Sequence, residues 1–281
     1  MGKVAVVTSS MACLPQTFID QYQIHIIRPF VVWGGESFRD GADLTPTEFY
    51  RNLKESKVLP TTATPSLGEF VDAYNEAGRG AEAVVAIHVS RELSYMYELG
   101  GQAAREISSV PVQVIDSRSV AMAMGFVVLA AARAAADGAG VQEVTEAAQA
   151  VIPKMNLFFV VDTLEYLHRS GRIGGAAALV GSVIQVKPIL YLTEGKIDVL
   201  EKPRTKGRAV RRMVEIMAER TEKSPVYASI LHADALEKAQ ELRDVVASRF
   251  DCFELYITDI TPVVGVHAGP GTLGLAFYTG N

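Results

Sequence analysis

The stretch AVVAIHV, residues 83–89, is an almost continuous run of apolar and β-branched residues. Two further runs, VAVVT (4–8) and VQVID (112–116), precede and follow it along the chain. Strands that are apolar on both faces are typical of a parallel sheet with helices on both sides. The sequence therefore predicts three buried parallel strands and an α/β arrangement for this part of the chain.

Helical signals separate and follow these runs. Residues 45–48 (TPTE) form a capping box with proline at the first helical position, and predict a helix from there to about Ser56. Residues 66–69 (SLGE) repeat the capping-box signal before a stretch that ends at a glycine. Further helices are expected over 99–107 and 120–138. Together these elements predict an N-terminal βαβ domain over residues 1–153.

The second half has a different pattern. Helices are expected only near 205–221 and 234–249, the latter with Asp234 as N-cap and Glu237 completing a capping box. Because strands outnumber helices, we predict a mixed α+β domain over residues 154–281, with a cleft between it and the N-terminal domain. The strand-like segments are NLFFVVDTL, KPILYLT, KIDVLEK, VYASILHA, CFELYITDI and LGLAFYTG.

Composition excludes several classes of function. The chain has 281 residues, 49% of them hydrophobic, and a net charge of −5, which gives no argument for nucleic acid as a partner. Its two cysteines, Cys13 and Cys252, are far apart and its five histidines are scattered, so no metal site is predicted. The longest apolar stretch, 120–132, is too short to span a bilayer, and no signal-peptide pattern is seen at the start. We therefore expect a cytoplasmic protein without stable membrane insertion.

The segment GPGTLG, residues 269–274, satisfies the G-x-G-x-x-G pattern of dinucleotide-binding loops. That motif requires a helix directly after it and an acidic residue about 20 positions further on. Only seven residues follow Gly274, and they have the pattern of a strand. A dinucleotide site is therefore excluded, which leaves a glycine-rich turn between two strands that carries His267.

Several motifs occur together in one order along the chain. In this combination the chain resembles the DegV family of bacterial fatty-acid-binding proteins, and the resemblance covers essentially its whole length. The patterns LEYLxxxGRIGG and GxHxGPGxLG are long and have little degeneracy. The segments that carry the resemblance are ATPSLGEF after Thr61-Thr62, Leu93-Ser94, VIDSRS (114–119), DTLEYLHRSGRIGG (162–175), KPIL (187–190), EKPRT (201–205) and GVHAGPGTLGL (265–275).

The resemblance implies a specific function. A long-chain fatty acid would lie in an apolar tunnel between the two domains, with its carboxylate bound by Thr62, Ser94, Arg172 and His267. The protein would be a non-catalytic carrier without a cofactor. A separate fatty acid kinase would phosphorylate the presented carboxylate, and the acyl phosphate would feed phospholipid synthesis.

Three of these residues also have a simpler interpretation. Thr62 could be a loop hydroxyl before a helix, Ser94 the N-cap of a helix over 95–107, and Arg172 a solvated loop arginine. His267 has the residue type that titrates near neutrality, so it could donate a hydrogen bond to a carboxylate. Hydroxyl, guanidinium and imidazole groups are all suitable donors to a carboxylate.

Further residues are possible neighbours of this site. Asp116 and Ser117 close the third predicted strand, where α/β sheets often place ligand-facing residues, although they could equally cap the next helix. Gly269 and the glycines that follow it are expected to leave room for the carboxyl group. A basic cluster is either a solvated face or a docking patch for an acidic partner or the phosphorylated product; it comprises Lys202, Arg204, Lys206, Arg208, Arg211 and Arg212.

The chain departs from the family pattern at a few positions. Ser9 occupies the place of the aspartate in the usual TDSS motif, and Thr64 that of a glutamine. Tyr95 and Met96 replace the G-T of L-S-G-T. These bulky residues beside the expected head-group site would shorten or reshape the pocket.

A second hypothesis concerns an enzyme subunit. The family's fold is similar to the substrate-binding part of dihydroxyacetone kinases, in which a histidine holds a small carbonyl compound, and His267 would take that role here. A tunnel lined by Leu, Ile, Val, Phe and Met favours the lipid carrier, whereas a small polar pocket around His267 favours the carbonyl-binding subunit. A DNA-binding regulator is disfavoured, because the sequence has no helix-turn-helix pattern and its total charge is acidic.

Overall fold

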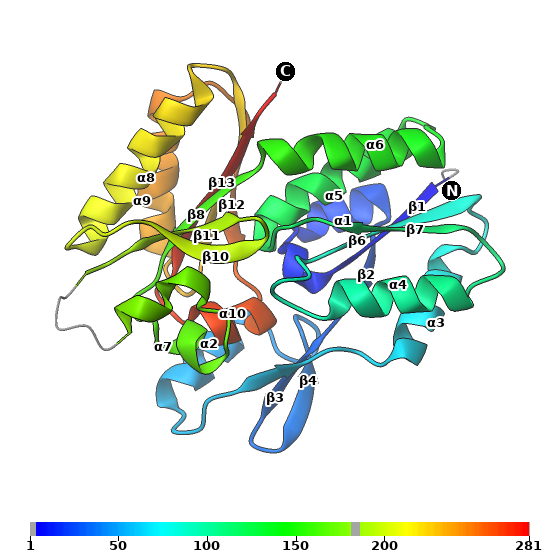
Figure 1. The fold of residues 1–281 in the computed structure, drawn as a ribbon, viewed down its shortest axis with the longest axis horizontal. Coiled ribbons are helices and arrows are strands. Elements are labelled where there is room, and N and C mark those ends of the chain that lie inside the picture. Colours follow the sequence, from blue (N-terminus) through cyan, green and yellow to red (C-terminus); the bar gives the residue numbers. More distant parts are fainter. Residues whose placement is uncertain (1–3, 181–185, 281) are drawn as a thin grey trace.

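A computed structural model describes residues 4–180 and 186–280 of the chain (Figure 1). The three apolar runs form neighbouring strands β1 (Val4–Ser9), β6 (Ala83–His88) and β7 (Val112–Asp116), all parallel. A short strand that the sequence pattern did not reveal, β2 (His25–Ile27), pairs with the free side of β1. The sheet order is β2-β1-β6-β7, which confirms the predicted parallel sheet.

Helices cover both faces of this sheet (Figure 1). Helices α3 (Leu67–Ala77) and α4 (Met96–Glu106) pack on one face, and α5 (Ala121–Ala136) and α6 (Val141–Val151) on the other. Such double coverage explains why the strands are apolar on both faces, since neither face meets water.

Helix α5 is buried around most of its circumference, including Met122, Phe126 and Leu129. It contacts the first sheet on one side and strands of a second sheet on the other. A helix between two sheets has no solvent face, which accounts for its uniformly apolar sequence. None of the helices in the described parts of the chain combines the length and apolar character that a membrane crossing needs.

Two of the three predicted capping boxes are present. Thr45 and Ser66 each accept a hydrogen bond from the backbone N–H three residues on, at the starts of α2 (Pro46–Glu55) and α3. The third prediction is wrong. Asp234 has a left-handed backbone (φ 53°) and its carboxylate forms an ion pair of 2.5 Å with Lys54, while α9 (Leu236–Arg249) has Ala235 as its N-cap. The local sequence predicts that the Asp234 carboxylate caps helix α9. In the structure it pairs with Lys54 instead.

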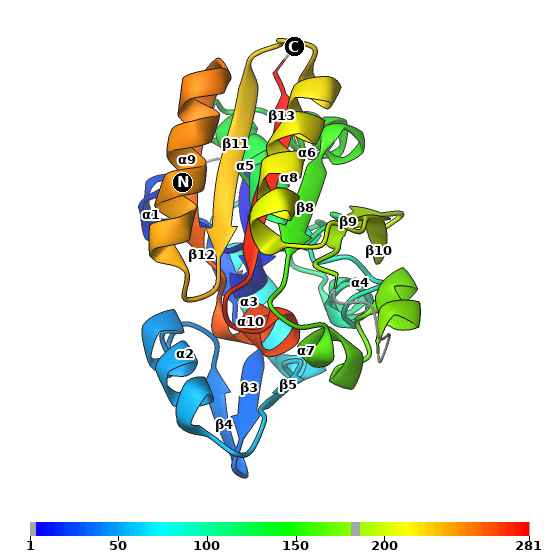
Figure 2. The ribbon, with the colours of Figure 1, turned by 90° about the vertical axis from the view of Figure 1, so that its left-hand side faces the viewer.

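The second half forms a six-stranded sheet in the order β10-β9-β8-β13-β11-β12. Strands β11 and β12 are parallel and the other neighbours antiparallel, which confirms the mixed α+β character. Helices α8 (Lys206–Thr221) and α9 cover one face (Figure 2), and the other face is turned towards α5. The strands are β8 (Asn156–Val160), β9 (Ile189–Thr193), β10 (Lys196–Glu201), β11 (Val226–His232), β12 (Cys252–Asp259) and β13 (Leu273–Thr279).

Strand β8 is shorter than the sequence pattern suggests. It ends at Val160, and the chain then enters the short helix α7 (Glu165–Arg169). Within the described residues, 3-10 turns are formed by η1 (Ser10–Ala12), η2 (Ile152–Lys154) and η3 (Gly174–Leu179).

A small third sheet was not predicted. It has the order β4-β3-β5 and is antiparallel, with β3 (Phe30–Trp33), β4 (Glu36–Arg39) and β5 (Thr61–Ala63). The strands are three to four residues long, too short for a reliable alternation signal. Helices α6 and α7 were not predicted either, and neither were α1 (Gln16–Tyr22) and α10 (Pro262–Ala268). Helix α10 packs against β3, β5 and α2.

The two halves of the chain share one hydrophobic cluster. Leu231 and Ala276 of the second sheet belong to the same buried cluster as Val85 of the first. Across this junction, the Tyr50 hydroxyl donates a hydrogen bond of 2.9 Å to the carbonyl of Ile260. The halves therefore pack against each other through apolar side chains, and the cavity described next lies within that contact.

Candidate functional site

A cavity of about 380 Å³ lies between the second sheet, helix α10 and the ends of the parallel strands. This volume is within the range of small-molecule sites in proteins, about 300–1,000 Å³. Most of the side chains that line the cavity are apolar, among them Met11, Leu93, Leu157, Phe159, Leu192 and Leu231. The walls are thus suited to an apolar ligand.

The four residues expected to bind a carboxylate all line this cavity: Thr62, Ser94, Arg172 and His267. The Thr62 Oγ1 and His267 Nε2 atoms are 3.2 Å apart, within hydrogen-bond distance. Three of them, Thr62, Arg172 and His267, also line a neighbouring pocket on the outer side. The fold therefore gathers polar groups from four separate segments at one end of an apolar cavity.

Thr62 lies on a strand and not on a loop. It is the central residue of β5, opposite Val31 of β3. The pairing fixes the backbone of β5 beside α10, which the third sheet contacts through both β3 and β5. The unpredicted sheet is thus the element that brings Thr62 to His267.

His267 lies in helix α10, and not in the expected turn between two strands. Helix α10 begins with Pro262 and is followed by Gly269, which has a positive φ of 77°. Within the helix, Gly265 faces the rings of Phe49 and Tyr50, and a Cβ there would collide with both. The close approach of α10 to α2 therefore depends on this glycine.

The pKa of His267 is lowered from 6.5 to about 4, first by burial and second by the positive charge of Arg172. The folded protein therefore lowers the His267 pKa below the unperturbed value near neutrality, and the ring is neutral at pH 7. A neutral imidazole keeps one N–H donor, so it can still bind an anionic oxygen. Its Nδ1 atom is buried and has no hydrogen-bond partner within the described residues.

Arg172 follows helix α7 and is held by two backbone carbonyls. Its Nε donates to the Leu93 carbonyl at 3.1 Å and its Nη1 to the Ser170 carbonyl at 2.5 Å. The bond to Leu93 joins the second half of the chain to the segment after β6. Arg172 is half-buried beside the cavity, and is therefore not simply a solvated loop arginine.

Ser94 lies in the turn between β6 and α4. Its backbone N–H donates to the Ser90 carbonyl at 3.2 Å, while the N-cap of α4 is Tyr95. The interpretation of Ser94 as an N-cap is therefore wrong. Of the two bulky departures, Tyr95 lines the cavity whereas Met96 is buried in the N-terminal core, so only Tyr95 borders the site.

The glycines after His267 make room for protein side chains. A Cβ on Gly269 would overlap the Tyr166 ring, and one on Gly271 would overlap the Asp162 carboxylate. Both glycines have a φ of 77°, which disfavours other residues. The expectation that these glycines leave space for a ligand carboxyl group was wrong, because Tyr166 and Asp162 occupy that space.

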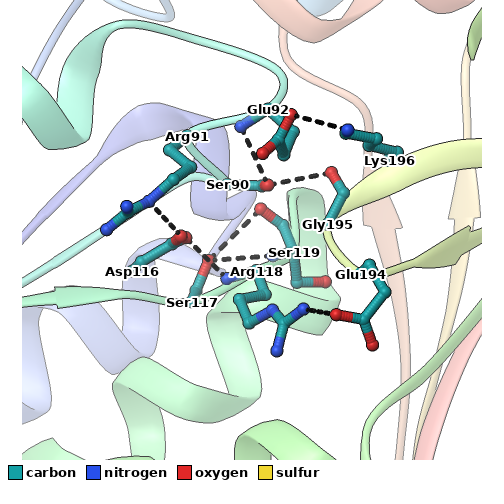
Figure 3. Close-up of polar contacts among 10 residues, drawn as sticks. All are labelled: Ser90, Arg91, Glu92, Asp116, Ser117, Arg118, Ser119, Glu194, Gly195 and Lys196. Carbon is teal, nitrogen blue, oxygen red and sulfur yellow. Dashed lines mark hydrogen bonds and ion pairs between the residues drawn. The ribbon is translucent and has the colours of Figure 1, made fainter.

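Asp116 and Ser117 are not among the residues lining the cavity. Asp116 accepts hydrogen bonds from Arg91 Nε at 3.1 Å and from the backbone N–H of Arg118 at 2.8 Å (Figure 3). The Ser117 hydroxyl donates to the carbonyl of Ser119 at 3.2 Å. These residues stabilise the loop after β7, so the structure does not bring them to the other four.

Asp40 is a residue that sequence reasoning missed. It is fully buried and its Oδ1 accepts from the backbone N–H of Val263 at 2.9 Å, while Ser10 Oγ donates to Oδ2 at 2.6 Å. Burial raises the pKa of the Asp40 carboxyl, and these hydrogen bonds act in the opposite direction. Asp40 thereby fixes the first turn of α10, which carries His267. No local pattern marks it, because its partner is 223 positions away.

The segment around Ser9 contains an unsatisfied group. Ser9, which stands where the family pattern has aspartate, is fully buried and its hydroxyl has no partner in the described chain. It does not line the apolar cavity but a separate pocket.

The basic cluster is partly neutralised by neighbouring carboxylates. Lys206 forms an ion pair of 2.6 Å with Asp162, and Arg212 one of 3.0 Å with Glu201. The cluster members without an ion pair among the described residues are exposed: Lys202, Arg204, Arg208 and Arg211. Over residues 4–180 and 186–280, no group of three or more His, Cys, Asp or Glu side chains is arranged to hold a metal ion.

Comparisons with known proteins agree with the motifs. The family model described as "Uncharacterised protein, DegV family" matches residues 3–280. A DegV domain-containing protein from Streptomyces coelicolor is 38% identical over 274 residues, covering 97% of both chains.

Solved structures give the same result for the fold. The crystal structure of DegV from Bacillus subtilis, described as a fatty acid binding protein, is 31% identical, with a TM-score of 0.93 over 100% of both chains. A DegV family protein from Thermus thermophilus, described by its fatty acid binding, is 29% identical, with a TM-score of 0.92 over 99% of both chains. With sequence motifs, family model and fold in agreement along its length, the chain belongs to the DegV family.

Proposed function

We propose that this protein binds a long-chain fatty acid in the apolar cavity, with the carboxylate at Thr62, Ser94, Arg172 and His267. One observation supports this most directly: a cavity with mainly apolar walls has hydroxyl, guanidinium and imidazole groups gathered at one end. The relatives described as fatty acid binding proteins support it independently. The apolar walls favour this ligand over the small carbonyl compound of the alternative hypothesis.

The two parts of the ligand make different demands on the protein. Burial of an alkyl chain contributes about 0.8 kcal/mol per methylene group, so the walls supply most of the affinity. A carboxylate that lost its water without gaining partners would oppose binding strongly. The polar groups therefore offset that loss and fix the orientation of the chain.

Charge complementarity assigns separate roles to Arg172 and His267. Arg172 supplies the permanent positive charge beside the carboxylate. His267 is neutral in the empty site and donates one hydrogen bond, and a bound carboxylate would raise its pKa. The Thr62 hydroxyl is 3.2 Å from His267 Nε2, so it can accept a hydrogen bond from that nitrogen and donate its own proton to the carboxylate.

We further propose that the protein is a carrier and not a catalyst. In this scheme a separate fatty acid kinase phosphorylates the presented carboxylate, and the acyl phosphate serves phospholipid synthesis. The polar end of the cavity adjoins an outer pocket that shares Thr62, Arg172 and His267, which gives a partner an approach to the carboxylate. The exposed basic side chains of Lys202 and Arg204 suit an acidic partner surface. The two domains, 1–153 and 154–281, would hold the lipid between them.

Denaturing extraction of the purified protein, followed by mass spectrometry, tests the ligand. We expect a long-chain fatty acid at about one molecule per chain, and a rise in Tm when fatty acid is added to delipidated protein. If extraction releases none, and added fatty acid leaves Tm unchanged, the carrier hypothesis is wrong.

A second experiment tests the division of labour with the kinase. The protein loaded with fatty acid and incubated with ATP and Mg²⁺ should form no acyl phosphate, whereas addition of a purified fatty acid kinase should produce it. Acyl phosphate formed by the protein alone would contradict the non-catalytic role.

A further inference from the structure

The apolar cavity adjoins a second pocket, of about 420 Å³, near the β9–β10 hairpin. Only two residues are common to the linings of these two spaces, Leu157 of β8 and Leu192 of β9. Leu157 is buried and Leu192 is partly buried. The two leucine side chains therefore stand between the cavity and the second pocket.

Along β8, the Leu157 side of this partition lies away from His267. At the end of β8 nearer His267, Val160 pairs with Leu273, which directly follows the cavity residue Thr272, and the Thr272 hydroxyl donates to the carbonyl of Ala268. Leu157 precedes Val160 by three residues, or about 10 Å along the strand. A chain whose carboxylate is bound at Arg172 and His267 therefore has its methyl end directed towards Leu157 when it follows β8.

The space beyond the partition differs in character from the cavity. Polar groups of Ser117, Arg118, Ser119 and Glu194 line much of it. Beside the partition, however, Ile152 and Met155 give it an apolar wall. A chain that passed the two leucines would thus find apolar contacts for a short distance and polar groups beyond.

The hairpin that carries Leu192 is fixed at its tip by the N-terminal domain (Figure 3). The Ser90 hydroxyl donates to the carbonyl of Gly195 at 2.8 Å, and Lys196 pairs with Glu92 at 3.3 Å. Arg118 forms a further ion pair with Glu194. These three contacts keep the hairpin, and with it Leu192, in a fixed position relative to the cavity.

The turn of the hairpin also depends on a close approach. Glu194 and Gly195 both have positive φ, as a two-residue type I′ turn requires. A Cβ on Gly195 would collide with the Ser90 hydroxyl. The backbone of Gly195 therefore packs directly against Ser90, just after β6.

We propose that Leu157 and Leu192 form the chain-length stop of the lipid site: they contact the methyl end of the bound chain and set the longest chain that is accepted. This proposal rests on the proposed function and adds which fatty-acid chain lengths the site accepts. Shortening either leucine joins the cavity to the apolar part of the second pocket, whereas enlarging Leu192 shortens the cavity.

Binding of saturated fatty acids from dodecanoate to docosanoate to the delipidated full-length protein tests the stop. For Leu192→Ala and Leu157→Ala we expect the preferred chain to lengthen by about two carbons. Two further buried methylene groups correspond to about a tenfold gain for the longer chain relative to the wild-type optimum. For Leu192→Phe we expect a shorter optimum, and this variant does not depend on a core that tolerates a cavity.

Ile197→Ala is the matched control. Ile197 pairs with Leu192 across the hairpin and lines the same cavity, but it does not border the second pocket. We expect weaker binding of every chain with an unchanged optimum. If the leucine variants bind fatty acids with the wild-type optimum, the stop is refuted while the carrier function stands. If the wild-type protein binds none of the series, the proposed function fails, and the stop with it.

Discussion

His88 and His267 are two histidines of the same molecule with nearly the same local chemistry. Each Nε2 is beside a hydroxyl, of Tyr74 at 2.7 Å and of Thr62 at 3.2 Å, and each Nδ1 lacks a hydrogen-bond partner within the described residues. Burial lowers both pKa values from 6.5 to about 4. A perturbed pKa and a hydroxyl partner therefore do not by themselves distinguish a binding residue from a core residue.

The surroundings of the two rings make the difference. His88 is fully buried at the end of β6, and a Cβ on Gly100 would approach its Nε2 to 2.6 Å, so no space is left beside it. His267 borders a cavity and has Arg172 as a charged neighbour. Unfilled space together with a charged neighbour is what marks the second histidine as a ligand-binding candidate.

The largest expected effect concerns stability at the core histidine. His88→Ala removes a ring from a close-packed region and leaves the Tyr74 hydroxyl without its partner, so we expect a loss of about 3 kcal/mol in the free energy of unfolding. Urea denaturation measures it, and the fatty-acid affinity of the folded fraction should be unchanged. A loss of affinity without a loss of stability would contradict the division between the two histidines.

Arg172 offers the next largest effect, on binding. Arg172→Gln removes the positive charge beside the carboxylate, and we expect fatty-acid binding to weaken by about 1.5 to 3 kcal/mol. Calorimetric titration of the delipidated protein measures it. Because the charge matters only for the ionised head group, affinity for the corresponding long-chain alcohol should change much less; an equal loss for both ligands would assign Arg172 a structural role.

The hydroxyls should contribute less than the guanidinium. The double variant Thr62→Ala with Ser94→Ala is expected to weaken binding by about 1 to 2 kcal/mol, since each neutral donor contributes about 1 kcal/mol. Both residues lie outside the buried core, so Tm without ligand should hardly change. Wild-type affinity in this double variant would remove both residues from the proposed head-group site.

The smallest effect is a difference in titration. Both histidines have a pKa below 6.5 in the folded state, so the unfolded chain binds protons first on acidification. The stability they contribute is complete above pH 6.5 and declines as the pH falls towards 4. Bound fatty acid should raise the pKa of His267 alone, and NMR titration of the ring protons with and without ligand measures it. A shift at His88, or at neither ring, would contradict the placement of the carboxylate.

Much of the fold could be predicted from local patterns. The parallel strands, the buried helix α5 and the six strands of the second half follow from apolar runs of suitable length, and two capping boxes mark helix starts. The short strands β3, β4 and β5 could not be predicted, because a strand of three or four residues carries too little periodicity. Asp234 was misassigned because its carboxylate pairs with Lys54 instead of capping the adjacent helix.

By itself, the sequence determined the family and the residue types of the candidate site, because the motifs that carry them are long and have little degeneracy. Only the tertiary structure decided how those residues meet: Thr62 and His267 are 205 positions apart, and a strand and a helix absent from the local patterns bring them together. The tertiary structure also decided that Gly269 leaves room for the Tyr166 ring. It further decided that Leu157 and Leu192 separate the apolar cavity from the pocket near the β9–β10 hairpin. The physical reason is that periodicity and capping report interactions within a few residues, whereas space and charge in a site depend on segments that meet only when the chain is folded.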